Sequence, residues 1–153
     1  MRSTYRTLSY IIAAEVVVQA SAIAFGLAGL GKYIEDGATV DKALFEDESV
    51  SFTGLIGFII HGINGQMVIP VLALALLIIS FFAKVTGGSK WAGTILALVV
   101  IQVTLGIFGH ETPQLAPFHG ANALLLFSVA IMTGRRVGAR STADVGSEHH
   151  LTA

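Results

Sequence analysis

The chain has 153 residues, of which 54% are apolar and only 12% are charged. A soluble domain usually carries roughly 25% charged residues, so this chain has too little polar surface to face water on all sides. It has no cysteine, which excludes disulfides, thiolate metal sites, iron–sulfur ligation and a thiol nucleophile. The net charge is −1, and the sequence lacks the basic character that is typical of nucleic-acid-binding proteins. Composition therefore predicts a small integral membrane protein.

Four apolar stretches are each long enough to cross about 30 Å of hydrocarbon at 1.5 Å per residue. They cover residues 8–30, 52–82, 91–108 and 117–133. Pro70 is expected to kink the second of these helices. We predict an all-α fold, an integral membrane four-helix bundle within residues 1–136. An acidic loop over residues 31–51 joins the first two helices, and a disordered cytoplasmic tail covers residues 137–153.

The basic residues predict the orientation of the chain in the membrane. Lys32 and Lys42 lie in or beside the acidic loop. The other seven basic residues lie at the opposite ends of the predicted helices: Arg2, Arg6, Lys84, Lys90, Arg135, Arg136 and Arg140. We therefore expect a plasma-membrane protein with both termini in the cytoplasm and the acidic loop outside.

An internal repeat divides the chain into two halves. The second and fourth stretches share the pattern His-Gly-x-Asn-small, at His61–Gly65 and at His119–Ala123. The first and third share a glutamine, Gln19 or Gln102, followed at the same distance by Phe-Gly. The bundle is thus predicted to consist of two repeated helical hairpins, with about 25 residues inserted in the outer loop of the first. Two spans per repeat give both copies the same orientation, so the two histidines are expected to face one another at similar depth.

A histidine inside the hydrocarbon layer is costly and therefore marks a candidate functional site. Each imidazole either hydrogen-bonds to a neighbouring helix or binds a ligand, and the duplication favours a ligand. Zinc usually takes three or four ligands, and no carboxylate is expected on the same face near either histidine. Haem iron needs only two axial ligands, and neutral imidazole serves well. We therefore predict a b-type haem held by His61 and His119.

Further candidate cofactor-binding residues come in pairs related by the repeat: Gly65 with Ala123, Asn64 with Asn122, and Gln19 with Gln102. The small residues leave space for a planar ring, although they also mark close helix packing. The asparagines either orient the imidazoles, meet the ring edge or form interhelical hydrogen bonds. The glutamines either line the pocket floor or cross-link the first and third helices, and the cross-link is favoured.

The chain resembles one four-helix half of the haem A synthase family, over its second to fourth predicted helices and, in the first, through Gln19 and Phe25-Gly26. The resemblance is carried by Gln102–Gly109, by the short proline-containing hairpin that follows, and by Pro117–Phe127. It also extends to small four-helix bacterial and archaeal membrane proteins with a His-Gly-x-Asn-Gly pattern. Haem A synthases consist of two four-helix bundles, each with two histidines that ligate haem. The resemblance therefore implies one such bundle, with ligands at His61 and His119.

The chain departs from this family at its catalytic positions. The family places a glutamate one turn before a histidine, where this chain has Gly57 and Leu115. The arginine that usually follows such a histidine is Gly62 here. We therefore do not expect hydroxylation of a haem methyl group, and expect no enzymatic activity from this chain by itself.

The predicted function is electron transfer or haem handling in the lipid bilayer, with a redox protein or a membrane complex as partner. Two alternatives stay open: a cofactor-free accessory or assembly subunit of a membrane complex, and a quinone- or lipid-binding module. No nucleic-acid partner is expected. The sequence leaves open whether haem is bound, whether the bundle forms a homodimer, and what Glu15 and the acidic loop do.

Overall fold

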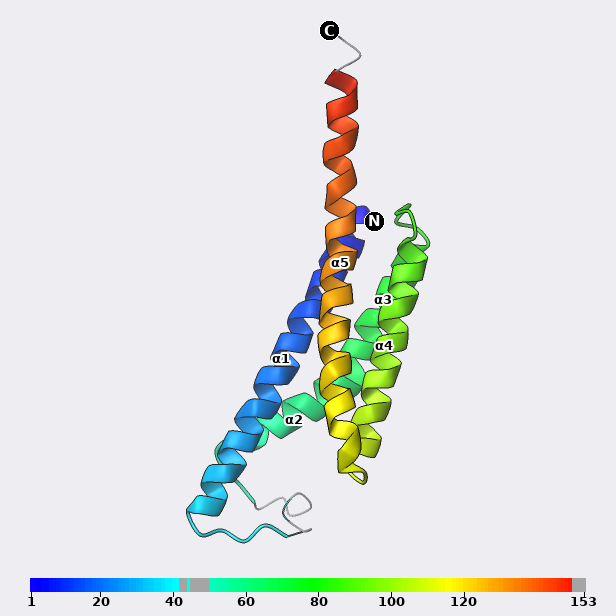
Figure 1. Ribbon diagram of the computed structural model, residues 1–153. Helices are drawn as coiled ribbons and strands as arrows, with labels where there is room; N and C mark the ends of the chain where they lie inside the picture. Colours follow the sequence, from blue (N-terminus) through cyan, green and yellow to red (C-terminus); the bar gives the residue numbers. More distant parts are fainter. Residues whose placement is uncertain (42–43, 45–49, 150–153) are drawn as a thin grey trace. The chain divides into compact units, whose positions relative to one another are not determined.

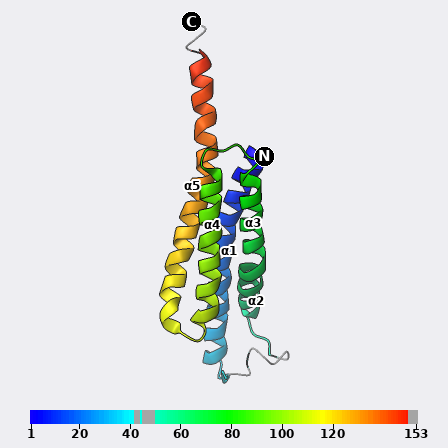
Figure 2. The same cartoon turned by 90° about the vertical axis from the view of Figure 1, so that its right-hand side faces the viewer.

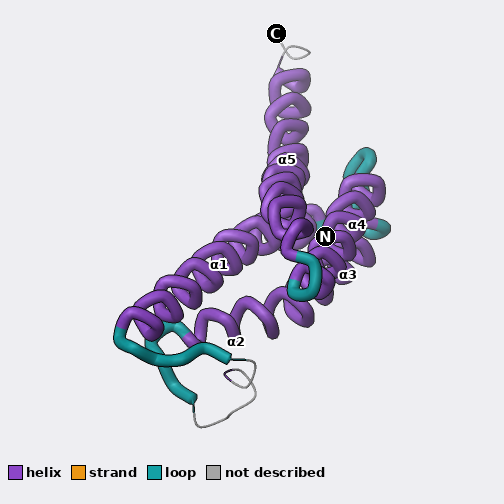
Figure 3. Tube along the Cα trace, turned by 60° about the horizontal axis from the view of Figure 1, so that its bottom comes forward, coloured by secondary structure: helices purple, strands orange, loops and turns teal. Residues whose placement is uncertain are grey.

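The computed structural model describes residues 1–41, 44 and 50–149, and this part of the chain is helical, with no strand (Figure 3). Figure 1 labels the α-helices. In chain order the elements are α1 (Arg2–Glu35), α2 (Leu55–Ile63), the π-helical segment η2 (Asn64–Val68), α3 (Ile69–Ser80), α4 (Gly88–Gly109), the 3-10 turn η3 (Pro113–Leu115) and α5 (Ala116–His149).

Four helical segments are long and apolar enough to cross a membrane: Arg2–Glu35, Leu55–Ser80, Gly88–Gly109 and Pro113–Val137. Large apolar side chains stay exposed along them, including Val17 at 53%, Val71 at 65% and Leu124 at 70% of their surface. Such extensive apolar exposure is unfavourable in water and favourable against lipid. The predicted all-α, four-helix membrane fold is confirmed.

The chain divides into two compact units. Unit 1 consists of residues 1–16 and 68–153, and therefore holds the start of α1 together with α3, α4 and α5. Unit 2 consists of residues 17–67 and holds the rest of α1 together with α2.

Unit 1 has a continuous apolar core. Helix α4 packs against both α3 and α5, and the three run side by side in Figure 2. All four helical segments contribute buried side chains, among them Ile12 from α1, Leu76 from α3, Ile95 from α4 and Leu126 from α5. The buried Tyr5 hydroxyl donates to the carbonyl oxygen of Gly88 at 2.9 Å, which joins the start of α1 to the start of α4.

Unit 2 is held together by a close approach of α1 and α2 at glycines. A Cβ atom added at Gly29 would lie 1.5 Å from the carbonyl oxygen of Thr53, and one added at Gly57 would lie 2.3 Å from that of Ala22. Gly54, just before α2, has a φ of 103°, which a residue with a Cβ rarely adopts. The two backbones are thus too close for any side chain at these positions.

The second span is less regular than expected. The sequence predicts one helix over residues 52–82, but the structure has α2, the π-helical η2 and α3 in succession. Pro70 lies in the first turn of α3. Proline has no backbone N–H, and its ring clashes with the carbonyl group four residues earlier, so regular α-helical bonding cannot continue through it. The distortion expected at Pro70 thus includes a π-helical segment just before it.

The helices also extend further than predicted. α1 ends at Glu35, past the expected boundary at residue 30, and Lys32 pairs with Asp36 one turn later. α5 runs to His149, over positions that the sequence assigns to a disordered tail. These positions contain no proline, so backbone bonding can continue beyond the apolar stretch. Of the predicted loop and tail, residues 42–43, 45–49 and 150–153 lie outside the described residues.

Candidate functional site

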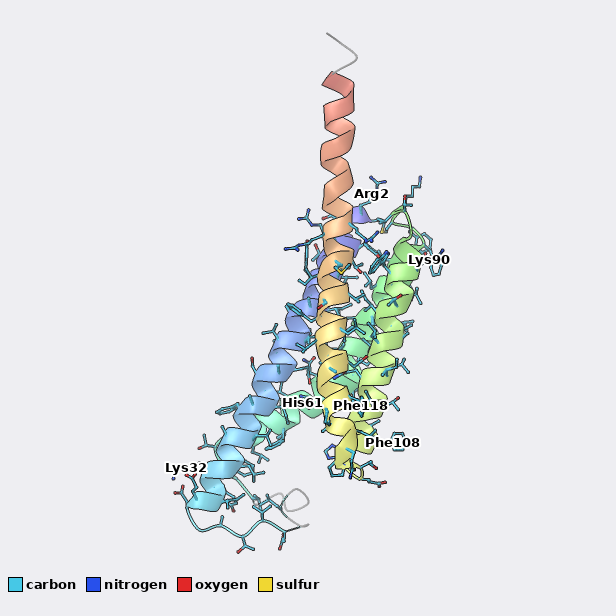
Figure 4. All side chains as sticks on the ribbon, viewed as in Figure 1. Arg2, Lys32, His61, Lys90, Phe108 and Phe118 are labelled. Atoms are coloured by element: carbon cyan, nitrogen blue, oxygen red, sulfur yellow. The ribbon has the colours of Figure 1, made fainter. Side chains whose placement is uncertain are left out.

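In unit 2, His61 on α2 is hydrogen-bonded to α1 through Gln19. Figure 4 shows His61 on α2, and its Nδ1 lies 3.2 Å from the backbone oxygen of Gln19. We orient the Gln19 amide so that its nitrogen donates to the carbonyl oxygen of His61 at 3.0 Å. Its side-chain oxygen then accepts from Asn64 Nδ2 at 3.1 Å and from the backbone N–H of Gly65 at 3.2 Å. Four residues predicted to border a cofactor are thus in one network.

In unit 1, His119 on α5 is hydrogen-bonded to α4 through Gln102. His119 Nδ1 lies 3.1 Å from the backbone oxygen of Gln102, and Gln102 Nε2 donates to the carbonyl oxygen of His119 at 3.0 Å. Asn122 Nδ2 donates to Gln102 Oε1 at 2.6 Å and to the backbone oxygen of Leu98 at 2.9 Å. Three of the predicted residues are thus in a second network.

The two networks contain the same three hydrogen bonds. In each, the Nδ1 of the histidine contacts the backbone oxygen of the glutamine, and the glutamine side-chain amide donates to the backbone oxygen of the histidine. The asparagine side chain donates to the side-chain oxygen of the glutamine. The repeated motif in the sequence is therefore also a repeat of bonding between the helices of each hairpin.

We assign the proton of each imidazole ring from these contacts. A carbonyl oxygen only accepts hydrogen bonds, so the Nδ1 facing it must carry hydrogen. In the neutral ring the lone pair then lies on Nε2. At His61, the Gln19 amide nitrogen also lies 2.8 Å from Nδ1, which would require an unprotonated Nδ1. The matching bond at His119 supports the carbonyl oxygen as the partner, and we assign Nδ1–H to both rings.

The glutamines do not have the role that the sequence favoured. We expected them to cross-link the first and third helices, but Gln19 joins α1 to α2 and Gln102 joins α4 to α5. The sequence lacks the information to choose between these pairings, since a glutamine side chain reaches any adjacent helix that offers a carbonyl. The expectation of a cross-link between the first and third helices is therefore wrong.

Two glycines of the second span, Gly57 on α2 and Gly65 in η2, lie against α1. A Cβ added at Gly65 would lie 3.2 Å from the side-chain amide of Gln19, and Gly57, one turn before His61, lies against the α1 backbone. For these two positions the structure favours the alternative of close helix packing over an open slot for a planar ring. Ala123 follows Asn122 on α5 and is half-buried.

Gly106 is a site residue that the sequence analysis missed. A Cβ added there would lie 3.2 Å from His119 Cε1, so the absence of a side chain lets the imidazole lie directly against α4. The signal that would have found Gly106 is its position one helical turn after Gln102, on the face that meets α5.

Unit 2 also carries an apolar groove of about 340 Å³ between α1 and α2. Its lining runs along α1 from Val17 to Phe25 and along α2 from Ile56 to Ile60. The one hydroxyl among the lining side chains, that of Ser21, donates to Val17 of its own helix at 2.9 Å. The lining thus offers little to orient a polar ligand.

Among the described residues, no group of three or more histidine, aspartate or glutamate side chains is placed to hold a metal ion. Comparisons of the chain with protein-family models, with curated proteins and with solved structures find no match. What defines the protein is thus its own architecture: an all-helical membrane chain with four spans, in which a His–Gln–Asn network occurs twice.

Proposed function

We propose that the protein binds one b-type haem, with His61 and His119 as the axial ligands. The observation that supports this is the contact of each Nδ1 with a backbone oxygen, which matches a ring N–H at Nδ1 and a lone pair at Nε2. Histidines that bind metals almost always donate their other ring N–H to a carbonyl, a carboxylate or water. A pair of neutral imidazoles is a donor set that haem iron accepts.

In this proposal the glutamines and asparagines are positioning residues. The backbone oxygens of Gln19 and Gln102 orient the rings. The side-chain amides of the same glutamines donate to the carbonyl oxygens of the histidines, which adds a second hydrogen bond between the same two helical turns. Asn64 and Asn122 hold the glutamine amides. The rings are thereby kept in one tautomer and one orientation before any ligand binds.

We propose electron transfer or haem handling as the activity. Haem would supply one-electron chemistry, and ligation by both His61 and His119 would favour electron transfer or haem carriage over oxygen chemistry. Gly57 and Leu115 offer no carboxylate where the haem A synthases have their glutamate, so we do not propose hydroxylation.

We further propose that the protein lies in the plasma membrane with both termini in the cytoplasm. This rests on the excess of basic residues at the ends of the spans that lie away from the acidic loop.

An absorption spectrum tests the haem proposal. The full chain is purified in mild detergent from haem-replete cells, and the reduced-minus-oxidised spectrum is recorded together with the haem content per chain. We expect about one haem per chain in the wild type and loss of the b-type signal in His61→Ala and in His119→Ala. His110→Ala is the matched control, since His110 is exposed at the end of α4, and it should retain the signal.

A folded but colourless wild type would overturn the haem proposal. Quinone in the lipid extract of that colourless protein would then point to quinone binding through the two imidazoles. A colourless chain that purifies with a larger complex would point to an accessory subunit.

A further inference from the structure

Basic side chains gather at one end of unit 1. They come from three separate segments and are all exposed: Arg2 and Arg6 on α1, Lys84 and Lys90 around the α3–α4 connection, and Arg135 and Arg136 on α5. Figure 4 shows Arg2 and Lys90 at the same end of the unit. We call these six residues the basic end.

Contacts between the segments hold the basic end together. Arg2 Nη2 donates to the backbone oxygen of Lys84 at 3.0 Å, which ties the start of α1 to the α3–α4 connection. The Arg136 guanidinium lies 4.3 Å from the centre of the Trp91 ring, which ties α5 to the start of α4. The charges are therefore brought together by the fold and not only by the composition of one segment.

The stretches of chain around these basic residues contain no acidic residue. Residues 1–14, 80–110 and 116–143 contain no aspartate or glutamate. Glu15 lies nine residues beyond Arg6, which is about 13 Å along the helix. On α5, Asp144 lies eight residues beyond Arg136, which is about 12 Å along the helix. The basic end therefore carries an excess of positive charge.

Aromatic rings at the basic end favour a position at the level of lipid headgroups. Trp91 lies beneath Arg136, and Arg6 lies 5.7 Å from the centre of the Tyr10 ring. Tryptophan and tyrosine are enriched where membrane spans meet the headgroups. A guanidinium stacked on such a ring keeps its planar N–H groups, which suit phosphate oxygens.

We infer that the basic end binds the phosphate groups of anionic phospholipids. Free phosphate has the same chemistry. A lipid is favoured because its acyl chains lie in the bilayer and so hold its phosphate at the headgroup level, beside Trp91. This site is distinct from the residues proposed to bind haem, and its test does not depend on them.

Phospholipid binding to the full chain tests the inference. The chain is reconstituted in neutral phosphatidylcholine nanodiscs, and the retention of added phosphatidylglycerol is measured by native mass spectrometry. Each basic residue near a charged surface contributes about 1 kcal/mol, which is about fivefold in affinity. The variant Arg2→Gln/Lys84→Gln/Arg136→Gln should therefore bind phosphatidylglycerol about a hundredfold more weakly. The charge-conserving control Arg2→Lys/Lys84→Arg/Arg136→Lys should stay within a few-fold of the wild type.

Salt and free phosphate provide the second measurement, which needs no variant. Raising the salt should weaken phosphatidylglycerol retention by the wild type and leave retention of phosphatidylcholine unchanged. Equal retention of the two lipids, no dependence on salt, or a glutamine variant that binds like the wild type would overturn the inference. Full competition by millimolar inorganic phosphate would also overturn it, because the site would then take a free anion.

Discussion

Each histidine ring meets a backbone oxygen of the neighbouring helix through its Nδ1. The oxygens of Gln19 and Gln102 lie in the middle of helices, where a carbonyl oxygen has a second lone pair for the imidazole. Substitution of the glutamine therefore leaves the ring its partner and removes only the side-chain part of the network. The two parts can be separated by mutation.

We expect Gln102→Leu to destabilise the protein by about 1–2 kcal/mol, because it removes one hydrogen bond to His119 and one from Asn122 within the membrane. Gln19→Leu should cost a similar amount, since the same bonds occur in the first copy. Unfolding in mixed detergent micelles measures both.

Ser128→Ala is the control for these glutamine variants. The Ser128 hydroxyl is exposed and donates to Leu124 of its own helix at 2.8 Å, so its loss should change stability by less than about 0.5 kcal/mol. A Gln102→Leu variant as stable as Ser128→Ala would show that the network contributes nothing to stability.

At the scale of the helices, the contact between α1 and α2 depends on positions without a side chain. Gly57→Ala would place its Cβ 2.3 Å from a backbone oxygen of α1, so the helices must move apart. We expect a loss of about 1–3 kcal/mol, as for other overpacked sites. Unfolding in detergent again measures the change.

Gly62→Ala is the matched control on the same helix, since a Cβ at Gly62 meets no atom within 4 Å. It should be neutral or slightly stabilising, because alanine favours helix more than glycine does. Equal effects of Gly57→Ala and Gly62→Ala would contradict the close approach of the two helices.

The helix boundaries show how far hydropathy predicts these elements. Hydropathy marks where a segment prefers lipid to water, and it located all four spans. Backbone hydrogen bonding does not stop at the membrane surface, however, so α1 continues to Glu35 and α5 to His149. Pro70 predicted a distortion of the second span. Whether that distortion is a kink or a π-helical segment depends on local backbone hydrogen bonding, which the sequence does not show.

At the scale of the whole molecule, the charge distribution predicts the topology. The chain has no cysteine, so a thiol reagent can label it only at a cysteine introduced by mutation. A membrane-impermeant maleimide should label Asp36→Cys in intact cells and Ser3→Cys only after permeabilisation. The reverse labelling pattern would mean that the basic end faces outward.

The sequence alone determined the membrane class, the four spans, the duplication and the identity of the histidines, glutamines and asparagines that form the networks. It did so because solvent preference and repetition are properties of residues in chain order. Only the tertiary structure decided which helix each glutamine joins, that Gly57 and Gly65 lie against α1, and that Gly106 lies against His119. Those contacts depend on how each helix is rotated about its axis and how closely it approaches its neighbour, and many rotations satisfy the same apolar pattern.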